Sequence, residues 1–175
     1  MKILKNKQFK DVYVVQNKTY KDHRGYFKEI LRENFIKKKF PFQVMFFSKK
    51  NVLRRLHMQK KNSQGKFVSV VKGKIFDVII DLRKNSKTFG KKYSIILSEK
   101  NSKSLYIPEG FAHGFCTLDK ENYVVYNCSK YRDKNNEIGL MYNDNDLKIN
   151  WPIDNPIMSK KDKENYSLKE LEFIL

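Results

Sequence analysis

The chain has 175 residues, and its 37 lysines and arginines against 19 acidic residues give a net charge of +18. This length suits one domain, expected to span 1–175, and no apolar stretch approaches the ~20 residues needed to cross a bilayer, so no membrane partner is expected. The basic start, Met1–Lys10, lacks a following apolar segment and does not resemble a signal peptide. Cys116 and Cys128 have no metal-like spacing, and we expect buried thiols in a cytoplasmic protein.

The excess of positive charge indicates either an anionic partner or a lysine-rich surface without a specific target. Lysines outnumber arginines and are scattered through every loop, whereas specific phosphate or base recognition tends to favour arginine forks. We therefore expect a general surface bias with a local diphosphate site within it, and no nucleic-acid partner.

Alternation of apolar and polar residues predicts strands along most of the chain. A short helix is predicted over 33–39, closed by Pro41, and a hairpin around Gly73 is predicted to join the strands on either side of it. Turn signals recur about every ten residues, which is typical of a sandwich or barrel. The predicted strands are 12–15, 26–30, 42–48, 52–58, 67–71, 75–82, 93–97, 104–107, 114–118 and 123–129.

The last residues have a different pattern. Ser167 and Glu170 have the spacing of a capping box, in which each side chain satisfies a free backbone N–H. The leucines from Leu168 to Leu175 share one apolar face. We expect a C-terminal helix over 167–175 that packs on the β-structure and is not a second domain.

Three short runs carry the residues of chemical interest. The first, 107–115, reads IPEGFAHGF and places His113 on a strand directly after a tight turn. The second, 51–59, reads NVLRRLHMQ and contains His57. The third, 159–162, reads SKKD and follows the single tryptophan of the chain.

In this order, the three runs resemble the dTDP-4-dehydrorhamnose 3,5-epimerases, cupin-like enzymes that epimerise nucleotide-linked 4-keto-6-deoxy sugars. The resemblance extends to DHRGYFKE at 22–29 and FDVIIDLR at 76–83, and it covers most of the chain. It implies an all-β fold, a cupin-type β-barrel or jelly roll with a few short helices, including one near the C-terminus. It also implies a homodimer to which the N-terminal strand segment, residues 1–50, contributes.

Epimerisation beside a ketone needs a base, a group that stabilises the enolate, and an acid on the opposite face. The ketone itself acidifies the proton, so no cofactor is expected. The resemblance implies His57 as the base, with Asp162 as the carboxylate that orients it, because imidazole titrates near neutral pH. It implies Tyr126 as the acid, because a phenol is neutral at physiological pH. The alternative for His57 is a packed strand histidine without a catalytic role. The alternative for Tyr126 is an ordinary core residue, because the chain has ten tyrosines.

A wider set of residues is implied to bind the substrate. Arg54 and Lys66 match cationic residues near the keto oxygen and diphosphate, and Asp77 is implied to support His113 as a second histidine–aspartate pair. The segment 22–29 is implied to reach the nucleotide pocket of the neighbouring subunit. The implied substrate-binding residues are Arg24, Phe27, Glu29, Gln43, Arg54, Lys66, His113, Tyr131, Glu137 and Lys161.

A metal site is not expected. Metal-binding cupins usually offer a paired His-x-His, a glutamate and a later histidine, but His57 is followed by Met58 and Gln59. The chain has three histidines in all, and they do not easily build such a site.

Three departures from the family pattern bear on the substrate. Arg55 stands where the family has glycine, and a glycine inside a strand often marks a bulge or the close approach of a ligand. Residues 43–48 lack the acidic–amide pair that often follows Gln43. Arg132 replaces the second aromatic of a tyrosine pair and leaves Tyr131 alone. Each departure is expected to tune the nucleotide or sugar that is accepted.

The resemblance therefore favours metal-free 3,5-epimerisation of dTDP-4-keto-6-deoxy-D-glucose to dTDP-4-keto-L-rhamnose, a step of rhamnose and surface-polysaccharide biosynthesis. One alternative is an epimerase that acts at C3 or C5 only, or on another nucleotide-linked sugar. A second alternative is a non-catalytic barrel that binds sugar nucleotides or nucleic acid, which the high charge favours but which leaves His57, Tyr126 and Asp162 unexplained.

Overall fold

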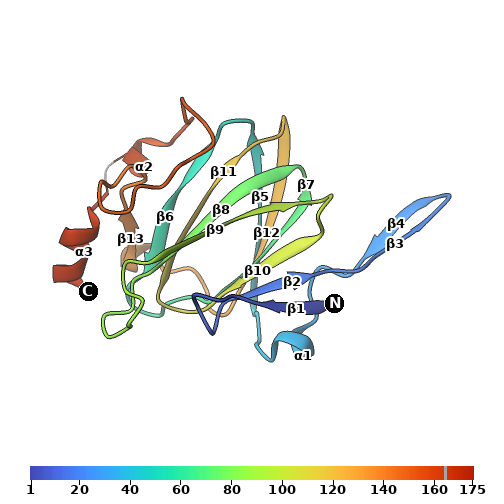
Figure 1. Ribbon diagram of the computed structural model, residues 1–175, viewed down its shortest axis with the longest axis horizontal. Helices are drawn as coiled ribbons and strands as arrows, with labels where there is room; N and C mark the ends of the chain where they lie inside the picture. Colours follow the sequence, from blue (N-terminus) through green and yellow to red (C-terminus); the bar gives the residue numbers. More distant parts are fainter. Residues whose placement is uncertain (164) are drawn as a thin grey trace.

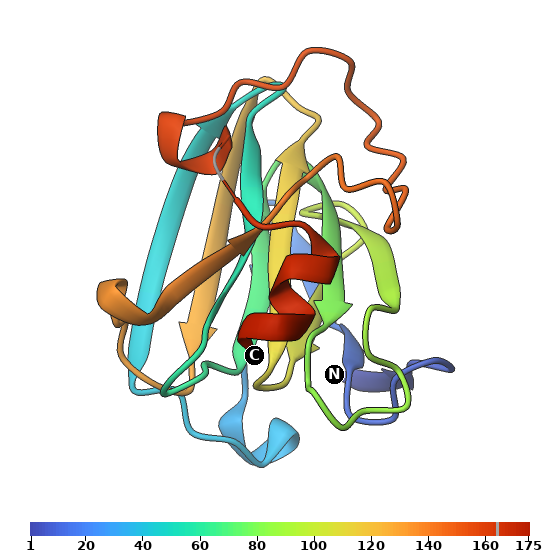
Figure 2. The ribbon, with the colours of Figure 1, turned by 90° about the vertical axis from the view of Figure 1, so that its left-hand side faces the viewer.

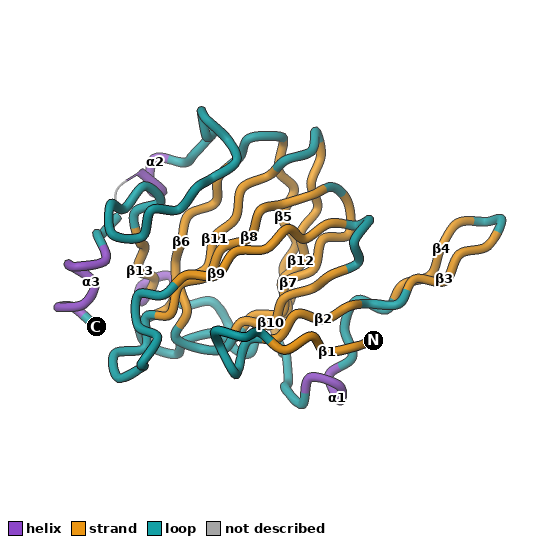
Figure 3. The backbone as a smooth tube through the Cα atoms, viewed as in Figure 1, coloured by secondary structure: helices purple, strands orange, loops and turns teal. Residues whose placement is uncertain are grey.

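The structure, a computed structural model, describes residues 1–163 and 165–175 and leaves out the side chains of Arg55 and Lys163. Two antiparallel sheets pack face to face, and the helices lie at the periphery (Figures 1 and 3). Between these two sheets no hydrogen-bonded strand pair occurs in the described part of the chain, so the sandwich is a jelly roll rather than a closed barrel. The predicted all-β class is confirmed.

The larger sheet has six strands, in the order β1 (Lys2–Lys5), β2 (Tyr13–Gln16), β10 (Lys103–Ile107), β7 (Lys66–Lys72), β12 (Glu121–Cys128) and β5 (Phe42–Lys49). The smaller sheet has five strands, in the order β13 (Glu137–Leu140), β6 (Leu53–Gln59), β11 (Phe111–Thr117), β8 (Lys74–Asp81) and β9 (Lys92–Ser98). The edge strand β5 of the first sheet and the β13–β6 edge of the second leave an opening at one side of the sandwich.

The remaining elements lie outside the two sheets. A separate hairpin, β3 (Thr19–Asp22) and β4 (Gly25–Lys28), projects from the body as an arm (Figure 1). The helices are α1 (Glu33–Ile36), α2 (Lys160–Lys163), α3 (Leu168–Ile174) and a 3₁₀ turn at Lys134–Asn136. Within the described residues, no helix combines the length and apolarity that crossing a bilayer would require.

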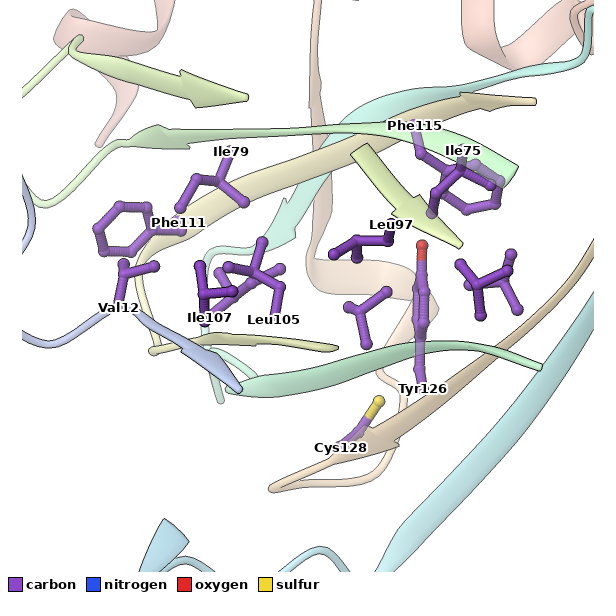
Figure 4. Packing of buried hydrophobic residues seen from close by; sticks show 14 of the residues in the cluster. Val12, Ile75, Ile79, Leu97, Leu105, Ile107, Phe111, Phe115, Tyr126 and Cys128 are labelled. Atoms are coloured by element: carbon purple, nitrogen blue, oxygen red, sulfur yellow. The ribbon is translucent and has the colours of Figure 1, made fainter. Parts of the chain in front are cut away.

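Strand alternation sends one set of side chains between the sheets. Ile75, Ile79, Phe115 and Leu105 belong to this central cluster, and Figure 4 shows them packed together. The alternate residues of β8 and β6, such as Val78 and Leu56, belong to a second buried cluster. They point to the outer face of the smaller sheet. That face is covered by the C-terminal segment.

The C-terminal helix α3 forms as predicted. The Ser167 hydroxyl accepts from the backbone N–H of Glu170, and the Glu170 carboxylate accepts from the backbone N–H of Ser167, which completes the capping box. Leu171 is fully buried against the outer face of the smaller sheet, and Figure 2 shows α3 lying across that face. The helix is shorter than the predicted 167–175 by its cap residues.

The predicted hairpin around Gly73 is wrong. β7 pairs with β10 and β12, whereas β8 pairs with β11 and β9, so the chain crosses from one sheet to the other at this turn. Gly73 has φ of +85°, and a Cβ there would meet the Glu121 carbonyl oxygen at 2.3 Å. The glycine permits a tight crossover as readily as it permits a hairpin.

Candidate active site

A cavity of about 440 Å³ lies at the open side of the sandwich. Phe42, Val44 and Phe46, at alternate positions on β5, form its apolar wall. Its polar lining contains seven residues that the sequence predicts for the site: Arg54, His57, Lys66, Tyr126, Glu137, Lys161 and Asp162. They come from β6, β7, β12, β13 and the C-terminal segment.

Arg54 and His57 both face the cavity because β6 is irregular between them. They are three residues apart, so a regular strand would send them to opposite faces. In the pairing of β6 with β11, however, His57 stands opposite His113 while Arg54 stands opposite Phe115, so the register shifts by one residue. This bulge turns both side chains inward. Arg55 lies within it, at the position of the family glycine, but its side chain lies outside the described residues.

The Arg54 guanidinium is held at the rim by neighbouring groups. Its Nε donates to the Ser48 hydroxyl at 3.1 Å and its Nη2 to the Phe47 carbonyl at 3.2 Å. The guanidinium carbon also lies 5.0 Å from the centroid of the Phe46 ring. Arg54 is therefore a fixed cation at one end of the apolar wall.

Tyr126 enters the cavity from the larger sheet, opposite His57. It pairs with Val44 of β5 and is 4% exposed, and its ring lies 4.8 Å from that of Phe46. Figure 4 shows its hydroxyl directed away from its own strand. Burial raises the pKa of Tyr126 well above its ordinary value, the negative charge of Asp77 adds to this, and Arg54 opposes it. The phenol is therefore protonated at neutral pH.

Lys66 and Glu137 lie at the other end of the cavity. Lys66 is buried, and its ammonium lies 5.9 Å from the centroid of the Tyr126 ring. Burial lowers the pKa of Lys66, and negative groups that include Glu137 oppose the effect. The carboxylate of Glu137 is bound by Arg132, with distances of 2.6 and 3.1 Å, and lies 3.6 Å from the Lys161 ammonium.

The segment that carries Lys161 and Asp162 is attached to the smaller sheet on both sides. Ile157 exchanges backbone hydrogen bonds with Asn51 and Leu53 at the start of β6. Tyr166 does the same with Gly139 and Met141 around the end of β13. Asp162 lies between these two attachments and lines the cavity together with His57.

The comparisons with known proteins agree with this arrangement. The sequence model of the family dTDP-4-dehydrorhamnose 3,5-epimerase matches residues 6–170. The dTDP-4-dehydrorhamnose 3,5-epimerase of Shigella flexneri is 37% identical, with all of both chains aligned. The chain belongs to the dTDP-4-dehydrorhamnose 3,5-epimerase family. It is therefore an isomerase of the nucleotide-sugar 3,5-epimerase type.

Two crystal structures of family members superpose closely on this epimerase. The Legionella pneumophila enzyme in complex with dTDP-4-keto-L-rhamnose has a TM-score of 0.91 at 35% identity, covering 97% of this chain and 96% of that one. The Bacillus anthracis enzyme with TDP and PPi bound has a TM-score of 0.90 at 34% identity, covering 95% of this chain and 98% of that one.

The histidine–aspartate pair of His113 and Asp77 lies behind the cavity. His113 Nε2 is 2.8 Å from Asp77 Oδ2, and both side chains are fully buried. The His113 ring centroid lies 5.1 Å from that of Tyr126, so the pair packs beneath the phenol without lining the cavity. Among the described residues, no cluster of three histidine, cysteine or acidic side chains has the arrangement of a metal site.

Other predicted residues lie outside the cavity of this single chain. Gln43 is on the outer face of β5, where it donates to Asn127 at 2.6 Å. Tyr131 is 68% exposed and packs on the Phe42 ring. Three more residues lie on or beside the projecting arm: Arg24, Phe27 and Glu29.

Five lining residues were not among the predicted catalytic or substrate-binding residues, although Arg132 was expected to tune the substrate: Phe42, Val44, Phe46, Arg132 and Ser159. The alternation of β5 could have predicted the apolar wall. Successive side chains of a strand point to opposite faces, so Phe42 and Val44 point inward when Gln43 points outward. Ser159 begins the SKKD run, and Arg132 is the residue that departs from the family's aromatic pair.

Proposed function

We propose that this protein catalyses the 3,5-epimerisation of dTDP-4-keto-6-deoxy-D-glucose to dTDP-4-keto-L-rhamnose, with His57, Asp162 and Tyr126 as its catalytic residues. One observation carries the proposal. A histidine and a carboxylate line the same cavity as a protonated phenol that enters from the opposite sheet. Removal of a proton from one face of a sugar and its return to the other need this separation of base and acid.

His57 is the proposed base. C3 and C5 both lie next to the C4 ketone, so the same imidazole serves both centres when the sugar ring presents each in turn. The carboxylate of Asp162 supports the imidazolium that forms after proton removal. The two attachments of the Asp162 segment, at Ile157 and Tyr166, favour a fixed position for that carboxylate over the cavity.

Lys66 and Arg54 are proposed to stabilise the enolate and the anionic part of the substrate. An ammonium or guanidinium group acts strongly on a developing oxyanion where water is excluded. Lys66 is buried at the cavity wall, which gives it such surroundings. Tyr126 then returns a proton from the opposite side, because burial keeps its hydroxyl protonated.

A homodimer is proposed to complete the nucleotide site. The β3–β4 arm presents Phe27, 63% exposed, and Tyr20, 51% exposed, to solvent. Arg24 at its tip is oriented by Asp22 at 2.7 Å. An arm of this composition, projecting from its own subunit, supports a contact with a partner subunit to which Arg24, Phe27 and Glu29 contribute.

A cytoplasmic location is also proposed. Cys116 and Cys128 are both buried and free of disulfide bonds. Free thiols of this kind are typical of compartments that keep cysteine reduced.

Proton NMR of dTDP-4-keto-6-deoxy-D-glucose incubated with the protein in deuterated water tests the proposal. We expect deuterium at both C3 and C5. Incorporation at one carbon would identify a single-centre epimerase, and incorporation into another nucleotide-linked sugar would change the substrate. Binding without any incorporation would refute catalysis and leave a sugar-nucleotide-binding protein.

A further inference from the structure

We propose that Arg132 is a specificity-determining residue that binds the diphosphate of the substrate in this epimerase. The inference rests on the proposed function, because it assumes a substrate with a nucleoside diphosphate. It concerns a residue that departs from the family pattern, in which an aromatic side chain is expected at this position.

The orientation of the Arg132 guanidinium leaves one of its nitrogen atoms available to a ligand. Nε donates to Glu137 Oε1 at 2.6 Å and Nη2 donates to Oε2 at 3.1 Å, so one edge of the guanidinium is held by the carboxylate. The Glu137 side chain is 4% exposed, whereas that of Arg132 is 52% exposed. Among the described residues, no acceptor pairs with Arg132 Nη1. A guanidinium that is held in place and still has an N–H donor without a protein acceptor is suited to bind an oxyanion.

The charges around Glu137 do not balance. Arg132, Lys66 and Lys161 are the cations near this end of the cavity, and Lys161 lies 3.6 Å from the Glu137 carboxylate. The described lining residues include two acidic side chains, Asp162 and Glu137. Their four cations are these three and Arg54. Among the described lining residues, positive charges therefore outnumber negative ones, and the diphosphate of a sugar nucleotide is a dianion that matches this excess.

Tyr131, the neighbour of Arg132, does not compete for this role. Its side chain is 68% exposed, its ring lies 5.6 Å from that of Phe42, and it is not part of the cavity lining. Arg132 is therefore the residue of this pair that lines the cavity. An aromatic ring offers stacking, whereas a guanidinium offers directed hydrogen bonds and charge, so this chain gains affinity through the diphosphate.

Calorimetric titration of purified protein with dTDP, thymidine and inorganic pyrophosphate tests the inference. We expect Arg132→Gln to weaken dTDP and pyrophosphate binding by about 10- to 100-fold and to leave thymidine binding nearly unchanged, because a charge-assisted contact is lost. The dTDP affinity of Arg132→Lys should lie between those of the unchanged protein and Arg132→Gln. Lys130→Gln removes an exposed charge two positions away, outside the cavity, and should bind dTDP like the unchanged protein.

A second pair of variants separates direct binding from neutralisation of Glu137. If Arg132 contacts the diphosphate, Glu137→Gln should bind dTDP at least as well as the unchanged protein does at moderate salt. The double variant Arg132→Gln/Glu137→Gln should then remain weak. Recovery of dTDP affinity in the double variant would overturn the inference, because Arg132 would then serve only to balance a buried carboxylate.

The remaining outcomes are also decisive. Unchanged dTDP affinity in Arg132→Gln, or an equal loss for thymidine and dTDP, would overturn the diphosphate contact. Failure of the unchanged protein to bind dTDP and pyrophosphate would overturn the contact and the nucleotide assignment together. Tight dTDP binding without deuterium exchange would contradict the proposed function and leave the Arg132 contact standing.

Discussion

His57 and His113 stand directly opposite one another on neighbouring strands β6 and β11. Opposite residues of an antiparallel pair point to the same face of a sheet, so both imidazoles face the interior of the sandwich. Their surroundings differ: His57 lines the cavity, whereas His113 is fully buried with Asp77. This difference supports the proposed catalytic role of His57 and indicates a structural role for His113, so substitutions at the two positions should have different effects.

His57→Gln should lower the rate of deuterium exchange by about 100- to 10,000-fold, because a positioned base contributes this much to proton transfer. Nucleotide affinity should stay close to that of the unchanged protein. Asp162→Asn should also slow exchange, because the imidazolium loses its carboxylate. The measurement is NMR-detected exchange together with titration of dTDP, and near-normal exchange in His57→Gln would remove it from the mechanism.

His113→Ala should mainly destabilise the fold. The substitution leaves Asp77 buried without its 2.8 Å partner and opens a cavity under Tyr126, which together should cost roughly 2–5 kcal/mol of unfolding free energy. Urea unfolding measures this loss. His57→Gln is the matched control, since it alters a half-buried histidine on the neighbouring strand of the same sheet. Equal stability of the two variants would contradict the structural role of His113.

Tyr126→Phe should separate proton removal from proton return. The variant keeps the ring that packs on Phe46 and His113 and loses only the hydroxyl. Exchange of substrate protons for solvent deuterium should therefore survive better than net epimerisation. Parallel measurement of washed-in deuterium and of the epimerised product tests this, and equal loss of both would argue against Tyr126 as the acid.

Asp81 should make part of the stability depend on pH. Burial opposes ionisation of Asp81, but hydrogen bonds from Arg83, Ser86 and Thr88 outweigh it and lower the pKa from 3.8 to about 2. The resulting stabilisation, about 2 kcal/mol, is present above pH 3.8 and is lost as the pH falls towards 2. The stability difference between the unchanged protein and Asp81→Asn should therefore shrink over this window in urea unfolding.

The exposed carboxylate of Asp154 provides the control for this experiment. The difference between the unchanged protein and Asp154→Asn should be small across the same pH series. A constant difference for Asp81→Asn from pH 5 to pH 2 would show that the hydrogen-bonded carboxylate does not supply the pH dependence.

Mixing two defective variants should restore activity if the arm acts on a partner subunit. In a mixed dimer of Arg24→Ala and His57→Gln, a site with an intact His57 would receive an intact Arg24 from the other chain. At low substrate concentration, the mixture should then turn over faster than the sum of the two separate variants. If each arm serves its own cavity, no mixed dimer contains an intact site, and the rates should simply add.

Periodicity in the sequence predicted most strands, and the capping-box spacing predicted the C-terminal helix. It did not predict which strands pair, because alternation reports the faces of a strand and not its neighbours. Gly73 illustrates this: the same φ of +85° serves a crossover between sheets here. Whether such a turn forms a hairpin or a crossover depends on how strands that are distant in the sequence pack together.

The candidate site was predicted in part, for reasons visible in single residues. Arg54 and His57 share a face through a bulge, which simple alternation does not reveal. Gln43 stays a predicted substrate-binding residue, but in this single chain the cavity-facing positions of β5 belong to its neighbours Phe42 and Val44. Whether Tyr131 or Arg132 faces the cavity depends on the path of the chain after β12, which no local pattern specifies.

The apolar wall of the cavity belongs to a strand with only one neighbour, since β5 is the edge of its sheet. Phe42, Val44 and Phe46 supply no acid, base or cation, and the ionisable groups of the cavity sit on other segments. Phe46 also packs on Arg54 and Tyr126, so the cavity can change shape at Phe42 and Val44 with the least effect on the groups proposed to act on the substrate. In an evolutionary or engineering setting, randomisation of Phe42 and Val44 is a route to new sugar selectivity that retains His57, Asp162 and Tyr126.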